Sequence, residues 1–334
     1  MSTDLIFNAL QGYLMERRPG AVIRDFAFVT SGWESDVYSF SFIDPSGETR
    51  PVVLRLFPGD SAEQKVLNEA NGLIRLRQAG FPVPALLFSE TGAAALGKPF
   101  LIVEKLEGQA LWPPLANASP EKTGVLLDRF CALMVQLHRL DWRPFCADPA
   151  ACAADPRRIL ADWFAAQRGM IQKFELPGFL AVIDWLESNI PPGGVKPAVV
   201  HRDFHGNNVF LQSSGEMAVI DWTQVGVFDY RIDLSWALLI MGDFGQQEWA
   251  KCILRNYEAQ TGSAVEYLAY FDAISYLKQL FDTIVTLRSG MQAAGLNPVK
   301  ASTIEQEAPL LKLYSQRLFD ITGIRIGEVE RLIG

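Results

Sequence analysis

A short polar stretch between two apolar runs holds the residue types best suited to chemistry. Residues 198–211, AVVHRDFHGNNVFL, place His201, Asp203, His205 and Asn208 between the apolar runs at either end. Short apolar runs bounded by polar residues favour buried strands, so we expect the polar part on a loop joining two strands. Carboxylate and imidazole groups accept protons, and carboxylate and amide oxygens bind hard cations. The stretch is a candidate catalytic loop.

A second carboxylate follows a short turn. The turn at 213–215 leads through the apolar residues 218–220 to Asp221, so that 198–221 reads as one hairpin. Asn208 and Asp221 are thirteen residues apart across it, and both offer the oxygen ligands that Mg²⁺ prefers. Phosphoryl transfer needs cations to neutralise charge on the phosphate oxygens. The pair is therefore our candidate metal site.

The order HRDFHGNN, followed by IDW, resembles a known pattern. Asp203 and Asn208 are five positions apart, as in the kinase loop H-R-D-x-x-x-x-N, where the Asp accepts the substrate proton and the Asn binds Mg²⁺. The second His and the Trp after Asp221 are similar to the aminoglycoside phosphotransferase and choline kinase-like family, with its H-G-D-x-H-x-x-N and I-D-W. The resemblance implies ATP and Mg²⁺ as cofactors, and Asp203 with His201 as the catalytic set.

The same resemblance extends on both sides of this loop, over roughly residues 25–240. Downstream, DYRIDLS is similar to the family's D-P-x-x-D-L-A, which implies that Asp233 holds the catalytic loop rather than reacts. Upstream, SGWESDVY looks like the loop that covers the nucleotide, and PVVLRLF has Arg where protein kinases carry the phosphate-contacting Lys. A guanidinium can clamp phosphate in the same way. The expected nucleotide-binding residues are Gly32, Ser35, Arg55, its partner Glu69, and Glu104 and Leu106 of the following connector.

The elements that must position these residues change type along the chain. Residues 21–57 alternate as short strands with a hairpin, 61–79 have helical spacing, and a buried strand ends near 104. From 121 onward the pattern is mostly helical, interrupted by Pro- and Ala-rich loops at 141–157 and 188–198. These patterns and the resemblance predict an α+β, bilobal protein-kinase-like fold. Residues 1–104 would form a nucleotide-covering N-lobe, and 105–334 a C-lobe with the catalytic loop, metal site and acceptor site.

Composition narrows the class of partner. The 334 residues include 30 Lys plus Arg against 38 Asp plus Glu, and the net charge of -8 argues against nucleic acid as a ligand. The four cysteines show no metal-site or redox spacing, and no long apolar stretch or leader pattern is present. We expect a cytoplasmic protein that does not bind membranes, as a monomer or homodimer.

Other interpretations of these motifs remain open. A protein kinase is disfavoured because no DFG or APE triplet follows, and a nucleotide-binding pseudoenzyme would carry the same motifs without transferring phosphate. The catalytic loop could also be an ordinary polar turn, or its two His and one Asp a zinc site. His138 ends an amphipathic helix, where a structural role is expected.

The acceptor is less well defined than the donor. A small hydroxylated molecule is expected, such as an amino sugar, an amino alcohol, another sugar or an antibiotic. Acidic residues between aromatics in the C-terminal helices would favour a cationic acceptor, although they could equally form a solvated helix face. These acidic residues are Asp243, Glu248, Asp272 and Asp282.

Overall fold

The computed structural model describes residues 2–294, 296–297 and 301–334, and they form two compact units. Unit 1 contains Met1–Glu107, Ile220–Thr223 and Ser289–Ala301. Unit 2 contains Gly108–Val219, Gln224–Arg288 and Ser302–Gly334. The expected boundary near 104 was drawn as a single division of the chain. The units are instead interleaved in sequence, and Asp221 belongs to unit 1.

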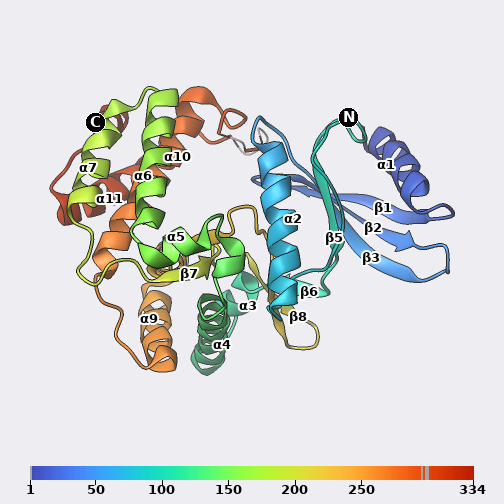
Figure 1. The fold of residues 1–334 in the computed structure, drawn as a ribbon, viewed down its shortest axis with the longest axis horizontal. Coiled ribbons are helices and arrows are strands. Elements are labelled where there is room, and N and C mark those ends of the chain that lie inside the picture. The colour runs from blue at the N-terminus through green and yellow to red at the C-terminus, as the bar shows by residue number, and fades with distance from the viewer. Residues whose placement is uncertain (1, 295, 298–300) are drawn as a thin grey trace. The chain divides into compact units, whose positions relative to one another are not determined.

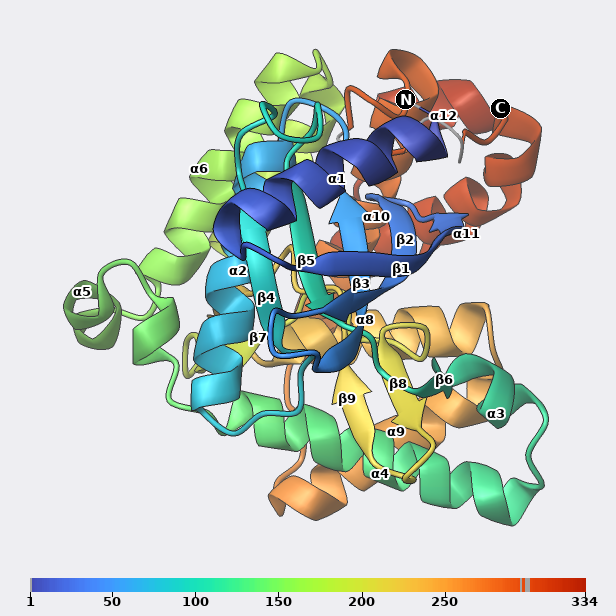
Figure 2. The ribbon, with the colours of Figure 1, turned by 90° about the vertical axis from the view of Figure 1, so that its right-hand side faces the viewer.

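Unit 1 is built on a five-stranded antiparallel sheet of strand order β1-β2-β3-β5-β4. Helix α1 lies across one face of this sheet (Figure 2). Its side chains Ile6, Leu10, Tyr13 and Leu14 recur at helical spacing and form one apolar core with the strands. This helix was not predicted from the sequence. The elements are α1 (Thr3–Arg17), β1 (Val22–Ser31), β2 (Asp36–Ile43), β3 (Thr49–Leu56), α2 (Ala62–Gln78), β4 (Leu86–Glu90) and β5 (Phe100–Glu104).

The opposite face of the same sheet carries helix α2 (Figure 1). Side chains alternate between the two faces of a strand, and in β3 the buried Val52, Leu54 and Leu56 belong to the core that includes α1. Arg55 therefore points to the other face, where it meets Glu69 of α2. The predicted helix at 61–79 and the hairpin of β2 and β3 are confirmed.

Unit 2 is mainly helical. Helix α4 packs against α9, and α9 also packs against α8. The loop expected at 141–157 contains a short helix, α5, and a 3-10 turn. The helices are α3 (Trp112–Ala116), α4 (Pro120–His138), η1 (Arg143–Phe145), α5 (Pro149–Ala154), α6 (Arg158–Lys173), η2 (Pro177–Phe179), α7 (Leu180–Ser188), α8 (Arg231–Asp243), α9 (Gln247–Thr261), α10 (Leu268–Ser289), α11 (Ile304–Thr322) and α12 (Gly327–Ile333).

Two small sheets in unit 2 hold the candidate catalytic loop. The loop joins two strands as expected, but the prediction of one hairpin over 198–221 is wrong. The strand before the loop pairs with β10, and the strand after it pairs with β9 and β6, so the loop links separate sheets. The strands are β6 (Gly108–Ala110), β7 (Pro197–Val200), β8 (Val209–Gln212), β9 (Met217–Val219) and β10 (Gly226–Asp229). Among the described helices, none combines the length and apolarity that crossing a bilayer requires.

Candidate active site

The Asp203 carboxylate is held by hydrogen bonds on both of its oxygens. Trp236 Nε1 donates to Oδ1 at 2.7 Å, and His205 Nε2 lies 3.3 Å from the same oxygen. Asn208 Nδ2 donates to Oδ2 at 2.8 Å and to the backbone oxygen of Asp203 at 2.9 Å. The side chain still keeps 30% of its surface exposed. The carboxylate is therefore fixed in direction and accessible to a small molecule.

The charges near Asp203 keep it ionised. Burial alone would raise the pKa of this carboxyl, because the charged form loses hydration. The charge and hydrogen bond of His205, together with the charges of His201 and Lys278, outweigh burial and lower the pKa of Asp203 to about 2. At neutral pH the group is a carboxylate that can only accept hydrogen bonds.

The backbone on the N-terminal side of Asp203 is held by a buried carboxylate. Asp233, in the first turn of α8, accepts hydrogen bonds from the His201 amide at 2.8 Å and the Arg202 amide at 2.6 Å. Arg202 has a positive φ of 66°, which is uncommon for a residue with a side chain. Such conformations persist where the surroundings enforce them. Asp233 therefore contacts the loop in the way that the resemblance implied.

His201 lies behind the loop rather than on its surface. Its side chain is fully buried, and its Nδ1 accepts the Asp203 amide at 3.2 Å. Within the described residues, no group of three His, Cys, Asp or Glu side chains is arranged to hold a metal ion. The zinc interpretation of His201, Asp203 and His205 therefore has no geometric support.

A second histidine supports Asp233 from the far side. His138, the last residue of α4, places Nε2 3.3 Å from Asp233 Oδ2 and Nδ1 2.9 Å from the Tyr257 hydroxyl on α9. All three side chains are buried or nearly so. The chain of contacts from Tyr257 through His138 to Asp233 thus ends on the amides of the catalytic loop.

In unit 1, Arg55 is the centre of a buried cluster of charges. Its Nε donates to Ser35 Oγ at 3.2 Å, Nη1 donates to Glu69 Oε1, and Nη2 donates to Asp221 Oδ1 at 2.9 Å. Burial opposes the charge, but Asp221 and Glu69 raise the pKa of Arg55, which stays protonated. The expected partner Glu69 is the one observed, and Glu63 in the first turn of α2 is exposed.

Glu69 is in an unusual environment for a carboxylate. It is 2% exposed, and within the described residues its Oε2 makes no hydrogen bond. Burial raises the pKa of Glu69 to about 7, although Arg55 acts in the opposite direction. Glu69 therefore titrates close to neutral pH while it positions Arg55.

The turn between β1 and β2 is attached to the same cluster. The Gly32 amide donates to the Ser35 oxygen at 2.8 Å, and a Cβ on Gly32 would lie 3.2 Å from that oxygen, so the turn favours glycine. Ser35 is buried against Arg55. Glu104, the last residue of β5, is exposed and accepts the Ala85 amide at 3.0 Å, while Leu106 is half-buried in the connector.

The residues predicted to hold Mg²⁺ each retain a suitable oxygen. Asn208 uses its amide nitrogen to bind Asp203, and among the described residues its Oδ1 makes no hydrogen bond. Asp221 Oδ1 accepts a hydrogen bond from Arg55, whereas Asp221 Oδ2 has no hydrogen-bond partner among the residues that the structure describes. The Asp221 side chain is 30% exposed. Asp221 also has a positive φ of 66°. Carboxylate and amide oxygens suit Mg²⁺, which takes few protein ligands and keeps several waters.

Several supporting residues escaped the sequence analysis. Glu34 pairs with Lys65 at 2.8 Å and accepts the Thr223 hydroxyl at 2.7 Å, which fastens the segment carrying Asp221 within unit 1. Trp236 was not singled out in the sequence. Its place three residues after Asp233, in the first turns of the same helix, was the one available signal.

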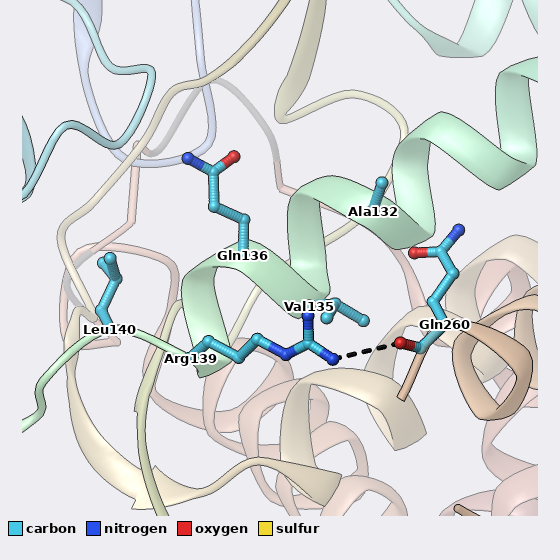
Figure 3. Close-up of a pocket in the computed structure, with 6 residues that line it drawn as sticks. All are labelled: Ala132, Val135, Gln136, Arg139, Leu140 and Gln260. Atoms are coloured by element: carbon cyan, nitrogen blue, oxygen red, sulfur yellow. Dashed lines mark hydrogen bonds between the residues drawn. The ribbon is translucent and has the colours of Figure 1, made fainter. Parts of the chain in front are cut away.

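A hollow elsewhere in unit 2 contains none of these residues (Figure 3). Its volume is about 550 Å³, and Arg139 donates across it to the Gln260 backbone oxygen at 3.1 Å. It lies against the last turns of α4 and the end of α9. None of the residues that line this hollow belongs to the predicted site. The lining residues are Ala132, Val135, Gln136, Arg139, Leu140 and Gln260.

The acidic residues that suggested a cationic acceptor all have partners inside unit 2. Burial raises the pKa of one of them, Asp272, to about 6, so part of its negative charge is lost near neutral pH. Each of these four carboxylates thus has a partner within unit 2, and a cationic acceptor stays a prediction. The pairs are Asp243 with Arg317, Glu248 with Lys251, Asp282 with Lys278, and Asp272 with the Ser235 hydroxyl.

Known phosphotransferases share the sequence pattern and the fold of this chain. The model of the phosphotransferase enzyme family matches residues 25–268. A crystal structure of an aminoglycoside-3'-phosphotransferase of type VIII superposes with a TM-score of 0.57 at 22% identity, covering 84% of this chain and 98% of that one. The streptomycin-ATP-APH(2")-IIa ternary complex superposes with a TM-score of 0.59 at 16% identity, covering 86% of this chain and 91% of that one. These likenesses confirm the α+β protein-kinase-like fold.

Similar curated proteins are much longer than this chain. Acyl-CoA dehydrogenase family member 11 of Gallus gallus is 26% identical over 157 residues, which are 44% of this chain and 19% of that protein. The probable acyl-CoA dehydrogenase IBR3 of Arabidopsis thaliana is 24% identical over 168 residues, which are 47% of this chain and 20% of that protein. The match thus spans about a fifth of the length of these relatives.

Proposed function

Because this chain belongs to the phosphotransferase enzyme family, we propose that it transfers the γ-phosphoryl group of ATP to a hydroxyl group of a small molecule. The observation that carries the proposal is the Asp203 carboxylate, which is oriented by Trp236, His205 and Asn208 and remains accessible. ATP as the donor is supported by the fold similarity to the streptomycin-ATP complex.

Asp203 is the catalytic base of the proposed reaction. The acceptor hydroxyl oxygen attacks the γ-phosphorus, the bond to the ADP oxygen breaks, and the hydroxyl proton passes to Asp203. With a pKa of about 2 the carboxylate is a weak base, so its main work is to orient the hydroxyl and take the proton as the new bond forms. His201 and Asp233 are positioning residues that hold the loop.

The nucleotide-binding residues we propose lie in unit 1. Arg55 would contact the phosphates. Its Nη2 donates a hydrogen bond to Asp221, so this nitrogen could bind a phosphate oxygen only after it gives up that hydrogen bond. Glu69 keeps the guanidinium in place. The turn from Gly32 to Ser35 would cover the phosphates, and Glu104 with Leu106 would contact the base.

Asn208 and Asp221 are the proposed ligands of Mg²⁺, through the side-chain oxygens that have no hydrogen-bond partner among the described residues. The ion, when bound, supplies positive charge against the phosphate oxygens.

The acceptor is proposed only as a class. Amino sugars, amino alcohols, other sugars and hydroxylated antibiotics all present the required hydroxyl group. The structures named for streptomycin and gentamicin describe what those proteins bind, and they justify including such compounds in a screen. A cationic group is not required by the four carboxylates discussed above, because each already has a partner.

The test is a transfer assay with purified protein, Mg²⁺, γ-labelled ATP and a panel of hydroxylated metabolites, antibiotics and a model protein substrate. We expect label on a small-molecule hydroxyl, and a loss of about 10²- to 10⁴-fold in Asp203→Asn with Mg-ATP affinity retained. Asp162→Asn, at an exposed position on α6, is the matched control. Label on protein alone, or no transfer and no hydrolysis of ATP, would favour a protein kinase or a pseudoenzyme instead.

A further inference from the structure

Two cysteines that are six positions apart meet in unit 2. Cys146 Sγ lies 3.1 Å from Cys152 Sγ, and both are free thiols. The other cysteines sit elsewhere: Cys131 is buried and contacts the Ile253 oxygen, and Cys252 contacts Arg255 and Asn256. We propose that Cys146 and Cys152 form a redox modification site, which closes to an intramolecular disulfide when a low-molecular-weight disulfide oxidises it.

The local backbone brings the thiols together. Cys146 follows the 3-10 turn η1 in an extended conformation, and Cys152 lies in the short helix α5. The Asp148 carboxylate caps that helix by accepting the Ala151 amide at 3.0 Å, which sets the turn between the two cysteines. A disulfide bond is about 2.0 Å long, so closure requires the sulfurs to approach by about 1 Å. A movement of that size lies within side-chain adjustment.

The two thiols differ in reactivity. Cys146 is half-buried, whereas Cys152 is buried. The hydrogen bond with Cys146, together with burial, raises the pKa of Cys152 to about 11, so its thiolate is scarce. Cys146 is therefore the sulfur that an oxidant in solution meets first, and Cys152 is the resolving thiol beside it.

The exchange balances with glutathione disulfide as the oxidant. Cys146 loses its proton to water, its thiolate attacks one sulfur of the oxidant, and a glutathione thiolate leaves. Cys152 then loses its proton to that thiolate and attacks the Cys146 sulfur of the mixed disulfide, so that the second glutathione leaves as a thiolate, which takes up the proton that Cys146 released. Two protein thiols are oxidised to one disulfide, and one glutathione disulfide is reduced to two thiols. Reduced glutathione drives the reverse reaction.

The disulfide would close a loop of residues 146–152, and none of these residues takes part in the proposed reaction. It would tie the turn after α4 to the helix that leads into α6. Disulfides in reducing compartments are usually transient and regulatory, so a closely spaced pair with one half-buried thiol suits a reversible modification.

The experiment exposes the full chain to graded glutathione disulfide, blocks remaining thiols by alkylation, and maps the products by mass spectrometry. We expect an intramolecular Cys146–Cys152 link at oxidant concentrations at least about tenfold below those that modify Cys252, since a neighbouring thiol acts at a high effective concentration. A reductant should restore all four thiols. Cys252→Ser, as the matched control, should form the same link.

Two further variants keep the proposal testable if the disulfide is hard to isolate. Cys152→Ser should stop at a stable glutathione adduct on Cys146, and Cys146→Ser should resist modification at Cys152. Each serine is nearly isosteric with the cysteine it replaces, and circular dichroism checks the fold. Glutathione adducts accumulating on Cys146 of the unaltered chain, or oxidation of Cys252 before the pair, would overturn the proposal.

Discussion

The indole nitrogen of Trp236 donates a 2.7 Å hydrogen bond to Oδ1 of Asp203, thirty-three residues earlier in the chain. Trp236 is 6% exposed, and Lys278 Nζ lies 4.6 Å from the centre of its ring. The indole is thus packed in place, and it sets the direction of the carboxylate as part of the rigid helix α8.

Trp236→Phe removes this donor and keeps most of the ring. A hydrogen bond to a charged group contributes about 1.5–3 kcal/mol, so kcat should fall by roughly 10- to 100-fold while the KM for ATP changes little. Steady-state kinetics with the acceptor found in the screen would measure this. Trp185→Phe, on α7, controls for loss of an indole, and an unchanged kcat in Trp236→Phe would remove Trp236 from the positioning of Asp203.

Asp221→Ala tests whether Asp221 binds Mg²⁺ or serves only as a hydrogen-bond partner of Arg55. Without Mg²⁺ the substitution should leave nucleotide affinity unchanged or improve it, because Arg55 Nη2 is released. With Mg²⁺ the affinity should fall at least about tenfold, since a carboxylate oxygen is lost from the metal. Calorimetry with ATP, with and without the metal, gives both values. Glu216→Ala is the exposed control, and equal losses under both conditions would show that Asp221 is not a ligand.

His138→Phe tests the support behind the catalytic loop. The change removes one of the two polar neighbours of the buried Asp233 Oδ2 and leaves only the His201 amide, which should destabilise folding by about 1–3 kcal/mol. The amides of His201 and Arg202 should also exchange hydrogen faster, because Asp233 is held less firmly. Tyr257→Phe removes only the outer contact and should have a smaller effect. Loss of stability without faster exchange in the loop would mean that His138 is merely a packing residue.

Glu69 predicts a stability that depends on pH near neutrality. Its folded-state pKa of about 7 lies above the ordinary value of 4.5, so between these values the folded protein binds more protons than the unfolded one. The free energy of unfolding should therefore decrease as pH rises from 4.5 to 7, and this contribution is lost above 7. Denaturant titrations across that range would record the slope.

Glu69→Gln should flatten this slope, and Glu63→Gln on the same helix should not. A residual slope is expected from Asp272, whose pKa burial raises to about 6. Identical slopes in the Glu69→Gln variant and the unaltered protein would indicate that Arg55 keeps Glu69 ionised at all these pH values.

Local patterns in the sequence were enough for part of this structure. The helix at 61–79 and the hairpin of β2 and β3 were predicted because their periodicity is read within a few turns or strands. The partner of Arg55 was predicted because resemblance placed it and helical spacing turned Glu69 inward. These features could be predicted because the residues that determine them are close together in the sequence.

Contacts between distant residues were not predictable in the same way. The hairpin assignment at 198–221 failed because β7 pairs with β10, and nothing local distinguishes the two partners. Trp236 was not singled out, and His138 was expected to have a structural role but no particular partner, since only the folded chain brings an indole to Asp203 and an imidazole to Asp233. Helix α1 was missed although its buried side chains recur at helical spacing, and the sheet face that it covers is known only from the structure.

The interleaving of the two units bears on how the protein can be divided. A fragment ending at Glu107 would lack Ile220–Thr223, and with it the Asp221 carboxylate and the Trp222 amide that meet Arg55 and Glu69. Removing one partner from a buried set of charges leaves the rest uncompensated. The part of the chain before residue 108 is thus an incomplete module, and only a chain that returns to it after β9 completes its charged interior.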